Sequence, residues 1–279
     1  MRGFTLIELV TVMVLLGIVA IVLAPVISAN MSTYSAARDQ VELTARGRLA
    51  LERLAREVRH AVPNTLRVVA DGRGIEFLRS RHGGRYVSEG DPNGSDWCLK
   101  IPGAAFSQAA RCFVAGEPRS ELYVLDDGSD WWEAERRLYL VIGNASPDDL
   151  GASTAELQKL TATTAVVDGV EGAGVLHFTQ TAFLIGSPGR HFFIADDFIE
   201  VGVSGDRLHW RQQNGVGEYN GSGDWDGADP ILVDGLRNAT FSYSPGIGQG
   251  NGVLSIELEL KQGAAQVVLY QNVQVRNAM

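Results

Sequence analysis

The chain has 279 residues, of which 45% are hydrophobic, and its formal net charge at pH 7 is −9. This length and composition exclude a disordered protein and favour one or two domains with a buried core of ordinary size. The acidic balance argues against binding to nucleic acid or to an anionic membrane surface, since either would require an excess of Lys and Arg on one face.

The chain opens with MRGFTLIELVTVMVLLGIVAIVLAPVISAN, in which one acidic residue, Glu8, precedes a long apolar run. No charged residue occurs from residue 9 to residue 37, and about 20 apolar residues suffice for a helix to cross a bilayer. Because Arg2 precedes the run, the positive-inside rule predicts a cytoplasmic N-terminus with the bulk of the chain on the other side. A secretory signal peptide is the alternative, but its best cleavage site, Ser28-Ala29-Asn30, fits poorly and gives Glu8 no role.

The residues Gly3-Phe4-Thr5-Leu6-Ile7-Glu8, followed by an apolar helix, closely resemble the type III signal of type IV pilins and pseudopilins. In that family a prepilin peptidase cuts after the glycine and methylates the new N-terminal aromatic residue. The resemblance implies a leader of residues 1–3 and a mature chain that begins at Phe4, with Glu8 as its fifth residue. This leader is shorter than is usual in the family. An alternative is therefore that translation starts upstream of Met1.

The resemblance also gives Glu8 a role. In a filament, the α-amine of one subunit's first residue is buried among apolar helices, and an unpaired buried ammonium is costly. A carboxylate from an adjacent subunit would neutralise that amine only in the correct axial register. We therefore expect Glu8 to act in assembly rather than in catalysis.

Helical periodicity continues beyond the apolar run. Pro25 removes a backbone hydrogen bond and is expected to kink or locally melt the helix. Further on, helical spacing is kept by six apolar residues: Val41, Ala45, Leu51, Leu54, Val58 and Ala61. Pro63 ends the helix, with Asn64 in a turn. We predict a transmembrane and filament-core part over residues 4–30, a part packed on the head over residues 31–62, and a periplasmic β-rich head formed by residues 63–279.

The stretch GRLALERLAREVRHAVPNTLRV, residues 47–68, resembles the corresponding helix of minor pilins of the PilW, PulJ/GspJ and MshO type. It is most similar to MshO-type subunits of the mannose-sensitive haemagglutinin pilus. LVDGLRNATFSYSPG and the closing VQVRN resemble the C-terminal part of the same group more weakly. The resemblance implies an α+β, pilin-like fold and no cofactor. Its implied partners are other major and minor pilin subunits, the prepilin peptidase and an inner-membrane assembly platform.

After Pro63, short apolar alternations separated by Gly, Asn and Asp predict antiparallel strands. The predicted strands cover residues 74–77, 99–101, 121–125, 137–142, 175–179, 192–194, 198–203, 207–212 and 240–243. The clearest signal is VLSIELELKQ, whose apolar residues alternate with polar ones, followed by AQVVLYQNVQV. With a turn at Gly263-Ala264, these two stretches predict a hairpin with one buried face.

Cys98 and Cys112 are the two cysteines of the chain. In an oxidising compartment they would close a loop of about fifteen residues, worth roughly 3 kcal/mol in the chain-entropy model. They lack the further Cys or His neighbours that a zinc site needs. We therefore prefer a disulfide to two free buried thiols.

Three turn motifs, NGSDWC (93–98), DGSDWW (127–132) and NGSGDWDG (220–227), place acidic residues beside tryptophans. Asn-Gly and Asp-Gly are strong turn formers. Asn220, Asp224, Asp226 and Asp229 offer oxygen ligands for Ca²⁺, but the spacing of an EF-hand is missing, so we favour plain turns and predict no metal site. We expect the tryptophans to pack over strand ends rather than to bind carbohydrate.

No catalytic pattern stands out. Five histidines show no metal-ligand spacing: His60, His82, His177, His191 and His209. Ser204 is not in a G-x-S-x-G elbow, no P-loop is present, and the doublet Asp196-Asp197 is interpreted as solvated rather than as a catalytic carboxylate pair.

We therefore predict a non-enzymatic minor pilin or pseudopilin of the bacterial inner membrane that helps to assemble, prime or cap a type IV pilus-like filament. Two alternatives stay open. One is a type II secretion pseudopilin of the J type, and the other is a membrane-tethered binding module or hydrolase.

Processing can be tested directly by N-terminal sequencing and mass spectrometry of the mature protein. We expect N-methyl-phenylalanine at position 4. A mature N-terminus near Asn30 would instead identify a cleaved secretory signal peptide.

Overall fold

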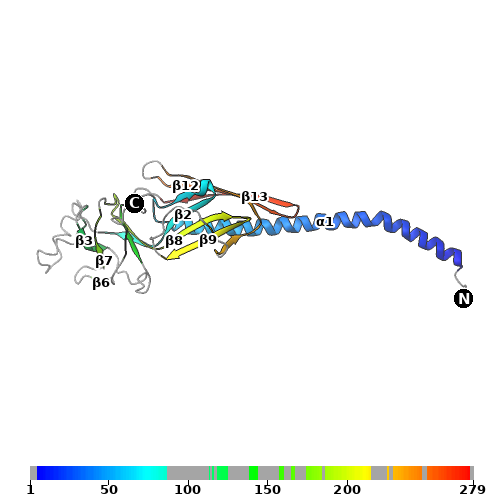
Figure 1. Ribbon diagram of the computed structural model, residues 1–279, viewed down its shortest axis with the longest axis horizontal. Helices are drawn as coiled ribbons and strands as arrows, with labels where there is room; N and C mark the ends of the chain where they lie inside the picture. Colours follow the sequence, from blue (N-terminus) through cyan, green and yellow to red (C-terminus); the bar gives the residue numbers. More distant parts are fainter. Residues whose placement is uncertain are drawn as a thin grey trace.

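The computed structural model is an elongated molecule in which one long helix projects from a head of antiparallel strands (Figure 1). It describes residues 5–86, 113, 115, 118–124, 138–143, 157–159, 165–166, 174–183, 186–214, 225, 229–246 and 250–276. The helix is α1 (Leu6–Arg59), and a short 3₁₀ segment covers Ala70–Gly72. The described strands are β1 (Arg67–Val69), β2 (Gly74–Arg85), β3 (Pro118–Val124), β4 (Tyr139–Val141), β5 (Leu157–Lys159), β6 (Ala165–Val166), β7 (Gly174–Ala182), β8 (His191–Ser204), β9 (Arg207–Asn214), β10 (Ile231–Val233), β11 (Leu236–Ser244), β12 (Gly252–Gln262) and β13 (Ala265–Val275). The α+β, pilin-like fold class predicted from the sequence is confirmed.

Helix α1 ends at Arg59, earlier than the predicted Val62. The reason is that the following residues already pair with β2. The Val62 N–H donates to the Leu78 carbonyl at 2.8 Å, and the Ser80 N–H donates to the His60 carbonyl at 2.7 Å. The chain therefore leaves the helix to form β-type hydrogen bonds before it reaches Pro63. Asn64 then adopts a φ of 59°, which fits the predicted turn.

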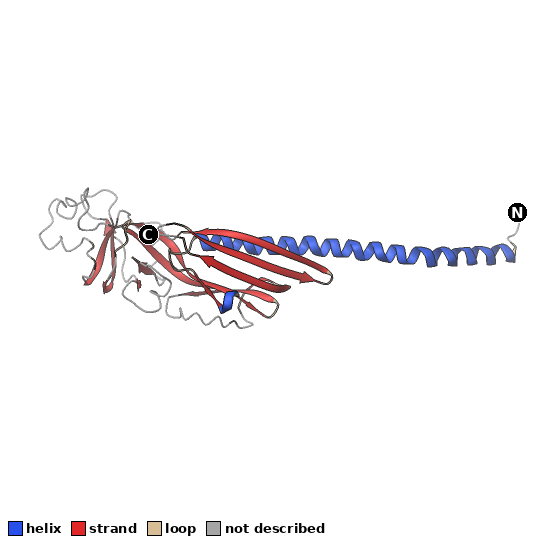
Figure 2. Ribbon diagram, turned by 90° about the horizontal axis from the view of Figure 1, so that it is seen from above, coloured by secondary structure: helices blue, strands red, loops and turns tan. Residues whose placement is uncertain are grey.

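Strand β8 organises the largest described sheet. Along one edge it pairs with β2 over nearly its full length, from Gly74↔Gly202 to Arg85↔His191. Its other edge is shared by β4 and β9 in turn, and β1, β5 and β10 extend the sheet from these strands. Two smaller sheets have the orders β11-β12-β13 and β3-β7-β6 (Figure 2). Every pairing is antiparallel, as expected for strands of this alternating pattern.

The predicted C-terminal hairpin is confirmed. Strands β12 and β13 pair from Gly252↔Val275 to Gln262↔Ala265, so the two-residue turn lies at Gly263-Ala264. Gly263 adopts a φ of +57°, a conformation that glycine reaches without steric penalty. The inward-facing residues of β12 are all buried: Leu254, Ile256, Leu258 and Leu260.

Two predicted strands, 192–194 and 198–203, are joined in the single strand β8. Strands β1, β5, β6 and β10 were not predicted, because two or three residues are too few to show an alternating pattern. The predicted strand at 99–101 lies outside the described residues.

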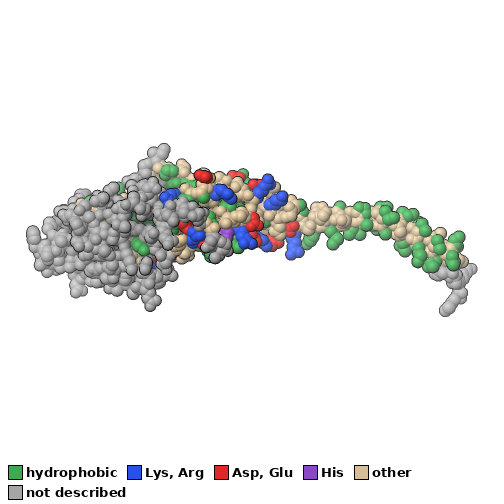
Figure 3. Space-filling model, in the orientation of Figure 1, with side chains coloured by type: hydrophobic (Ala, Val, Ile, Leu, Met, Phe, Trp, Pro, Cys, Tyr) green, Lys and Arg blue, Asp and Glu red, His purple; other side chains and the backbone are tan. Residues whose placement is uncertain are grey.

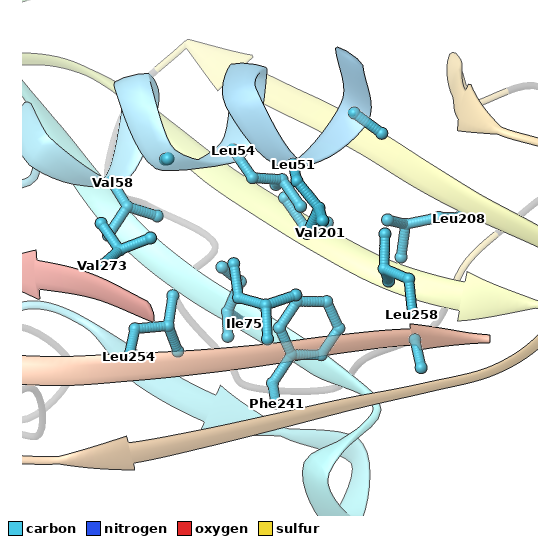
Figure 4. Close-up of a cluster of buried hydrophobic side chains, with 14 of the residues drawn as sticks. Leu51, Leu54, Val58, Ile75, Val201, Leu208, Phe241, Leu254, Leu258 and Val273 are labelled. Carbon is cyan, nitrogen blue, oxygen red and sulfur yellow. The ribbon is translucent and has the colours of Figure 1, made fainter. Parts of the chain in front are cut away.

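The helix joins two of the three described sheets, the largest one and β11-β12-β13, into one core. Its buried residues are Leu43, Gly47, Ala50, Leu51, Leu54, Ala55 and Val58, which recur every three or four positions and form one face. Figure 4 shows Leu54 and Val58 pointing toward Ile75 of β2 and Val273 of β13. Side chains from β8, β9, β11 and β12 complete this core.

Val41 and Ala45, two of the residues that keep the helical spacing, lie in α1 but are exposed. The buried face instead begins at Leu43 and continues through Gly47, whose lack of a side chain allows a close approach. A Cβ atom built on Gly47 would lie 2.4 Å from Leu269 Cδ1 and 2.7 Å from Leu260 Cδ1. A pattern of large apolar residues does not reveal a contact made by a glycine.

Two leucines of α1 test this packing. Leu54 is fully buried, whereas Leu49 is 70% exposed. We expect Leu54→Ala to lower the free energy of unfolding by about 2–5 kcal/mol, because it removes apolar contacts and leaves a cavity. The matched control Leu49→Ala should change it by less than about 0.5 kcal/mol. Urea unfolding of the full chain in detergent measures both, and equal effects would contradict the docking of this face.

Candidate functional site

The half of α1 that projects from the head is apolar on all sides. Residues 5–35 are all exposed, and this part of the helix is long and apolar enough to cross a membrane. Figure 3 shows hydrophobic side chains along the projecting segment, whereas charged side chains gather on the head. A helix that is apolar all round requires an apolar environment, which a bilayer or a bundle of like helices provides.

The length of the projecting segment fits a bilayer with some excess. The uncharged stretch of residues 9–37 spans about 44 Å at 1.5 Å per residue, compared with about 30 Å for the hydrocarbon core. The first buried helix residue is Leu43. The helix therefore has enough length to cross the bilayer and to leave a short neck before the head.

Glu8 belongs to a capping box at the start of α1. Its carboxylate accepts hydrogen bonds from the Thr5 N–H at 3.0 Å and from the Thr5 hydroxyl at 2.8 Å. In return, the Glu8 N–H donates to Thr5 Oγ1 at 3.4 Å. This arrangement satisfies backbone donors that the first turn leaves free, and it places the carboxylate near the positive end of the helix dipole.

The capping box changes the energetics of an acid in an apolar segment. A buried carboxylate without partners is strongly destabilising, but Glu8 has two donors within its own chain. A carboxylate accepts about four hydrogen bonds, so the box leaves capacity for a further donor. Glu8 is thus partly satisfied in a single chain and able to bind a cation from another one.

Other predicted site residues are placed as follows. Pro25 lies inside α1, which stays helical through it; the projecting half is curved in Figure 1, and a kink at Pro25 itself stays a prediction. Gly3 and Phe4 precede the described residues. Cys98 and Cys112 also lie outside them, so the disulfide stays a prediction.

Asp229 is the one proposed calcium ligand within the described residues. Its carboxylate accepts hydrogen bonds from Arg211 at 2.9 and 2.6 Å. The Trp225 ring lies over the same guanidinium at 5.1 Å and packs against Gly202, which is the packing role expected for this tryptophan. Within the described part of the chain, no group of three or more His, Cys, Asp or Glu side chains is placed to hold a metal ion.

Asp196 and Asp197 are buried in β8, so their interpretation as solvated residues was wrong. Arg79 of β2 donates hydrogen bonds to both carboxylates, and the Gln212 side chain donates to Asp197 at 2.7 Å. These partners come from two other strands. Because these partners compensate the buried charges, β8 continues through Asp196-Asp197, where the sequence pattern predicted a gap between two strands.

A second set of charges forms a row across four strands. Cross-strand register places Arg67 opposite Glu76, Glu76 opposite Glu200, and Glu200 opposite Arg211. The outer arginines pair with the inner carboxylates at 2.9 and 3.0 Å. Burial raises the pKa of Glu200 above its usual value; Arg211 opposes this shift, and the charges of Glu76 and Asp229 add to it.

Residues 1–24 match the family described as the prokaryotic N-terminal methylation motif. The chain carries a type IV pilin-like prepilin signal. With the apolar helix that follows it, this signal indicates a prepilin peptidase substrate and a membrane-anchored, pilin-like protein. No curated protein and no solved structure matches the chain.

Thr5 is the partner of Glu8 that the sequence prediction missed. Its signal was present, because Thr5-Leu6-Ile7-Glu8 has the T-x-x-E spacing of a capping box before an apolar run. The charged row had no such local signal, since its four members are brought together only by strand register.

The raised pKa of Glu200 predicts how stability depends on pH. A carboxyl group whose pKa is higher in the folded than in the unfolded state stabilises the fold at low pH, and this contribution is lost as the pH rises through the folded value. Glu200→Gln resembles the protonated form. We therefore expect its stability, relative to the native chain, to increase between pH 4 and pH 7.

Urea unfolding at a series of pH values measures this difference. Glu42→Gln, at a largely exposed carboxylate of α1, controls for the loss of one negative charge. A stability difference for Glu200→Gln that stays constant over this pH range would contradict the pKa shift.

Proposed function

We propose that this protein is a minor pilin or pseudopilin, stored in the bacterial inner membrane and then incorporated into a type IV pilus-like filament. The observation that carries the proposal is the combination found in α1. The helix starts with a prepilin signal, exposes a mainly apolar half and continues without interruption into the core of the head.

The projecting half of α1 provides the driving force for both environments. Each Val, Leu or Ile side chain transferred from water to an apolar surrounding contributes about 1.5–3 kcal/mol. In the membrane this surface is covered by lipid, and in a filament by the helices of other subunits. Because apolar packing is non-directional, it does not by itself fix how far one helix is shifted along its neighbour.

Glu8 provides that axial register. After cleavage, the α-amine of Phe4 is the nearest strong cation at the start of each helix, and methylation of an amine keeps its positive charge. The Glu8 carboxylate of one subunit pairs with this amine of the next, and a shift by one turn separates the two charges. The hydrogen bonds from Thr5 hold the carboxylate at the helix start before the partner arrives.

The finer assignment is a minor subunit of the MshO, PilW or PulJ/GspJ type that acts at the start or tip of a filament. It is supported by the resemblance of residues 47–68 to such subunits. The head is also larger than is needed to cover the buried face of α1. In this arrangement the N-terminus is cytoplasmic and the head is periplasmic. The prepilin peptidase, an assembly platform and other pilins are the partners.

Three variants separate charge from capping. Glu8→Val removes both, Glu8→Gln keeps the shape and hydrogen-bonding capacity but removes the charge, and Thr5→Val removes the capping hydroxyl alone. We expect all three to be cleaved and inserted. Glu8→Val and Glu8→Gln should enter filaments at least about tenfold less, since loss of a desolvated ion pair exceeds 1.4 kcal/mol. Thr5→Val should lose only the roughly 1 kcal/mol of a helix cap.

Immunoblots of sheared filaments against the membrane fraction, from cells that express each variant in place of the native chain, measure incorporation. Normal incorporation of both Glu8 variants would refute the register role. If Glu8→Gln enters filaments normally and Glu8→Val does not, the role of Glu8 is to cap the helix and its charge is not needed.

A further inference from the structure

A second site lies where α1 ends. A cavity of about 350 Å³ opens between the C-terminal end of α1 with the two residues that follow it, the second half of β2, the start of β8 and the residue that follows β13. This volume is at the lower end of the range for small-molecule pockets. Regular elements build its walls, which favours a fixed shape over one that forms only on binding.

The described lining of the cavity is strongly basic. It includes four arginines, Arg59, Arg81, Arg85 and Arg276, and no Asp or Glu among the residues that the structure describes. This concentration of positive charge is unexpected in a chain with a net charge of −9. It does not follow from the composition of the protein.

Three of these arginines have no acidic partner among the residues that the structure describes. Arg59, Arg85 and Arg276 are exposed and form no ion pair with any residue in the described ranges, whereas Arg81 lies 3.7 Å from Asp196. The arginines of the neighbouring sheet behave differently, since Arg79 pairs with buried carboxylates. The C-terminal end of α1 contributes only about half a negative charge, so the described part of the lining carries a clear excess of positive charge.

The strand that forms the cavity wall is irregular at this point. The register between β2 and β8 shifts at Arg79/Ser80 and again at Ser80/His82. The shifted segment is held in place, because the Ser80 N–H donates to the carbonyl of His60, the residue after α1, at 2.7 Å and its hydroxyl donates to the His82 carbonyl at 3.0 Å. Such bulges redirect side chains, often next to functional sites.

Three histidines that are distant in sequence also meet here: His60, His82 and His191. They do not form a metal site, because no group of metal-binding side chains occurs among the described residues. A neutral imidazole still offers one N–H donor. The cavity therefore presents hydrogen-bond donors and positive charge together, which is the chemistry of an oxyanion site.

We propose that this cavity binds a phosphate group, either as inorganic phosphate or as part of a small organic phosphate. The planar fork of a guanidinium group matches two phosphate oxygens. A phosphate monoester carries close to two negative charges at neutral pH, which suits a lining with four described arginines better than a single carboxylate does. The site lies in the head and does not depend on the filament role.

Isothermal titration calorimetry of the full chain in an uncharged detergent tests this site. Inorganic phosphate and glycerol 3-phosphate serve as ligands at constant physiological ionic strength, and a triglutamate peptide serves as a carboxylate ligand. We expect saturable binding of phosphate, about tenfold weaker in Arg59→Gln and in Arg276→Gln because each removes a charge-assisted contact. Tighter binding of glycerol 3-phosphate would identify the organic phosphate as the better ligand.

Arg207→Gln is the control, because Arg207 is an exposed arginine of the head outside the described lining of the cavity. It should bind phosphate as the native chain does, and all variants should keep the native urea midpoint. Equal weakening by Arg207→Gln, or no saturable binding at about 10 mM phosphate, would overturn the proposal. Binding of triglutamate without binding of phosphate would also overturn it and would indicate an acidic protein segment as the occupant.

Discussion

The packing of one helix face against two sheets is the contact on which the rest of the molecule depends. Between Leu43 and Val58, α1 closes the core formed by β11-β12-β13 on one side and by β2, β8 and β9 on the other. Neither sheet buries this apolar surface without the helix, and an open sheet with one exposed apolar face is unstable in water. The same helix then leaves the head and continues, beyond a short polar stretch, as an exposed and mainly apolar segment. The segment that completes the fold is therefore continuous with the segment that anchors the protein.

Charges in the head are arranged in two contrasting ways. Within the large sheet, arginines pair with carboxylates that the fold has buried, as Arg211 does with Glu200 and Arg79 does with Asp197. Removing one partner from such a pair leaves an uncompensated charge, so these contacts hold the strands in register. At the end of α1, by contrast, arginines such as Arg85 meet no described carboxylate. The first arrangement is accounted for by stability, whereas the second is the basis of the proposed phosphate site.

The sequence predicted those features whose signal is local. The alternation in β12 and the Gly263-Ala264 turn are contained within a few residues, and so is the prepilin signal around Glu8. Features that depend on distant partners were missed. Strand β8 was divided at Asp196-Asp197, because the arginine that pairs with this doublet lies on β2. The cavity was missed for the same reason, since its basic residues come from both ends of the chain and meet only when α1 docks. The close contact at Gly47 was also missed, because a pattern of apolar residues does not reveal a contact made by a glycine.

The continuity of α1 has a mechanical consequence. The described helix has no break from Leu6 to Arg59, and its last four turns are fixed in the core. A displacement of the helix along its axis therefore moves the head by the same distance, and a slip of one residue corresponds to a translation of about 1.5 Å and a rotation of about 100°. If Glu8 forms the proposed ion pair, that contact would set the position and the orientation of surfaces roughly 80 Å away. In a filament, the axial position of the helix start would then determine where each head lies and which way it faces.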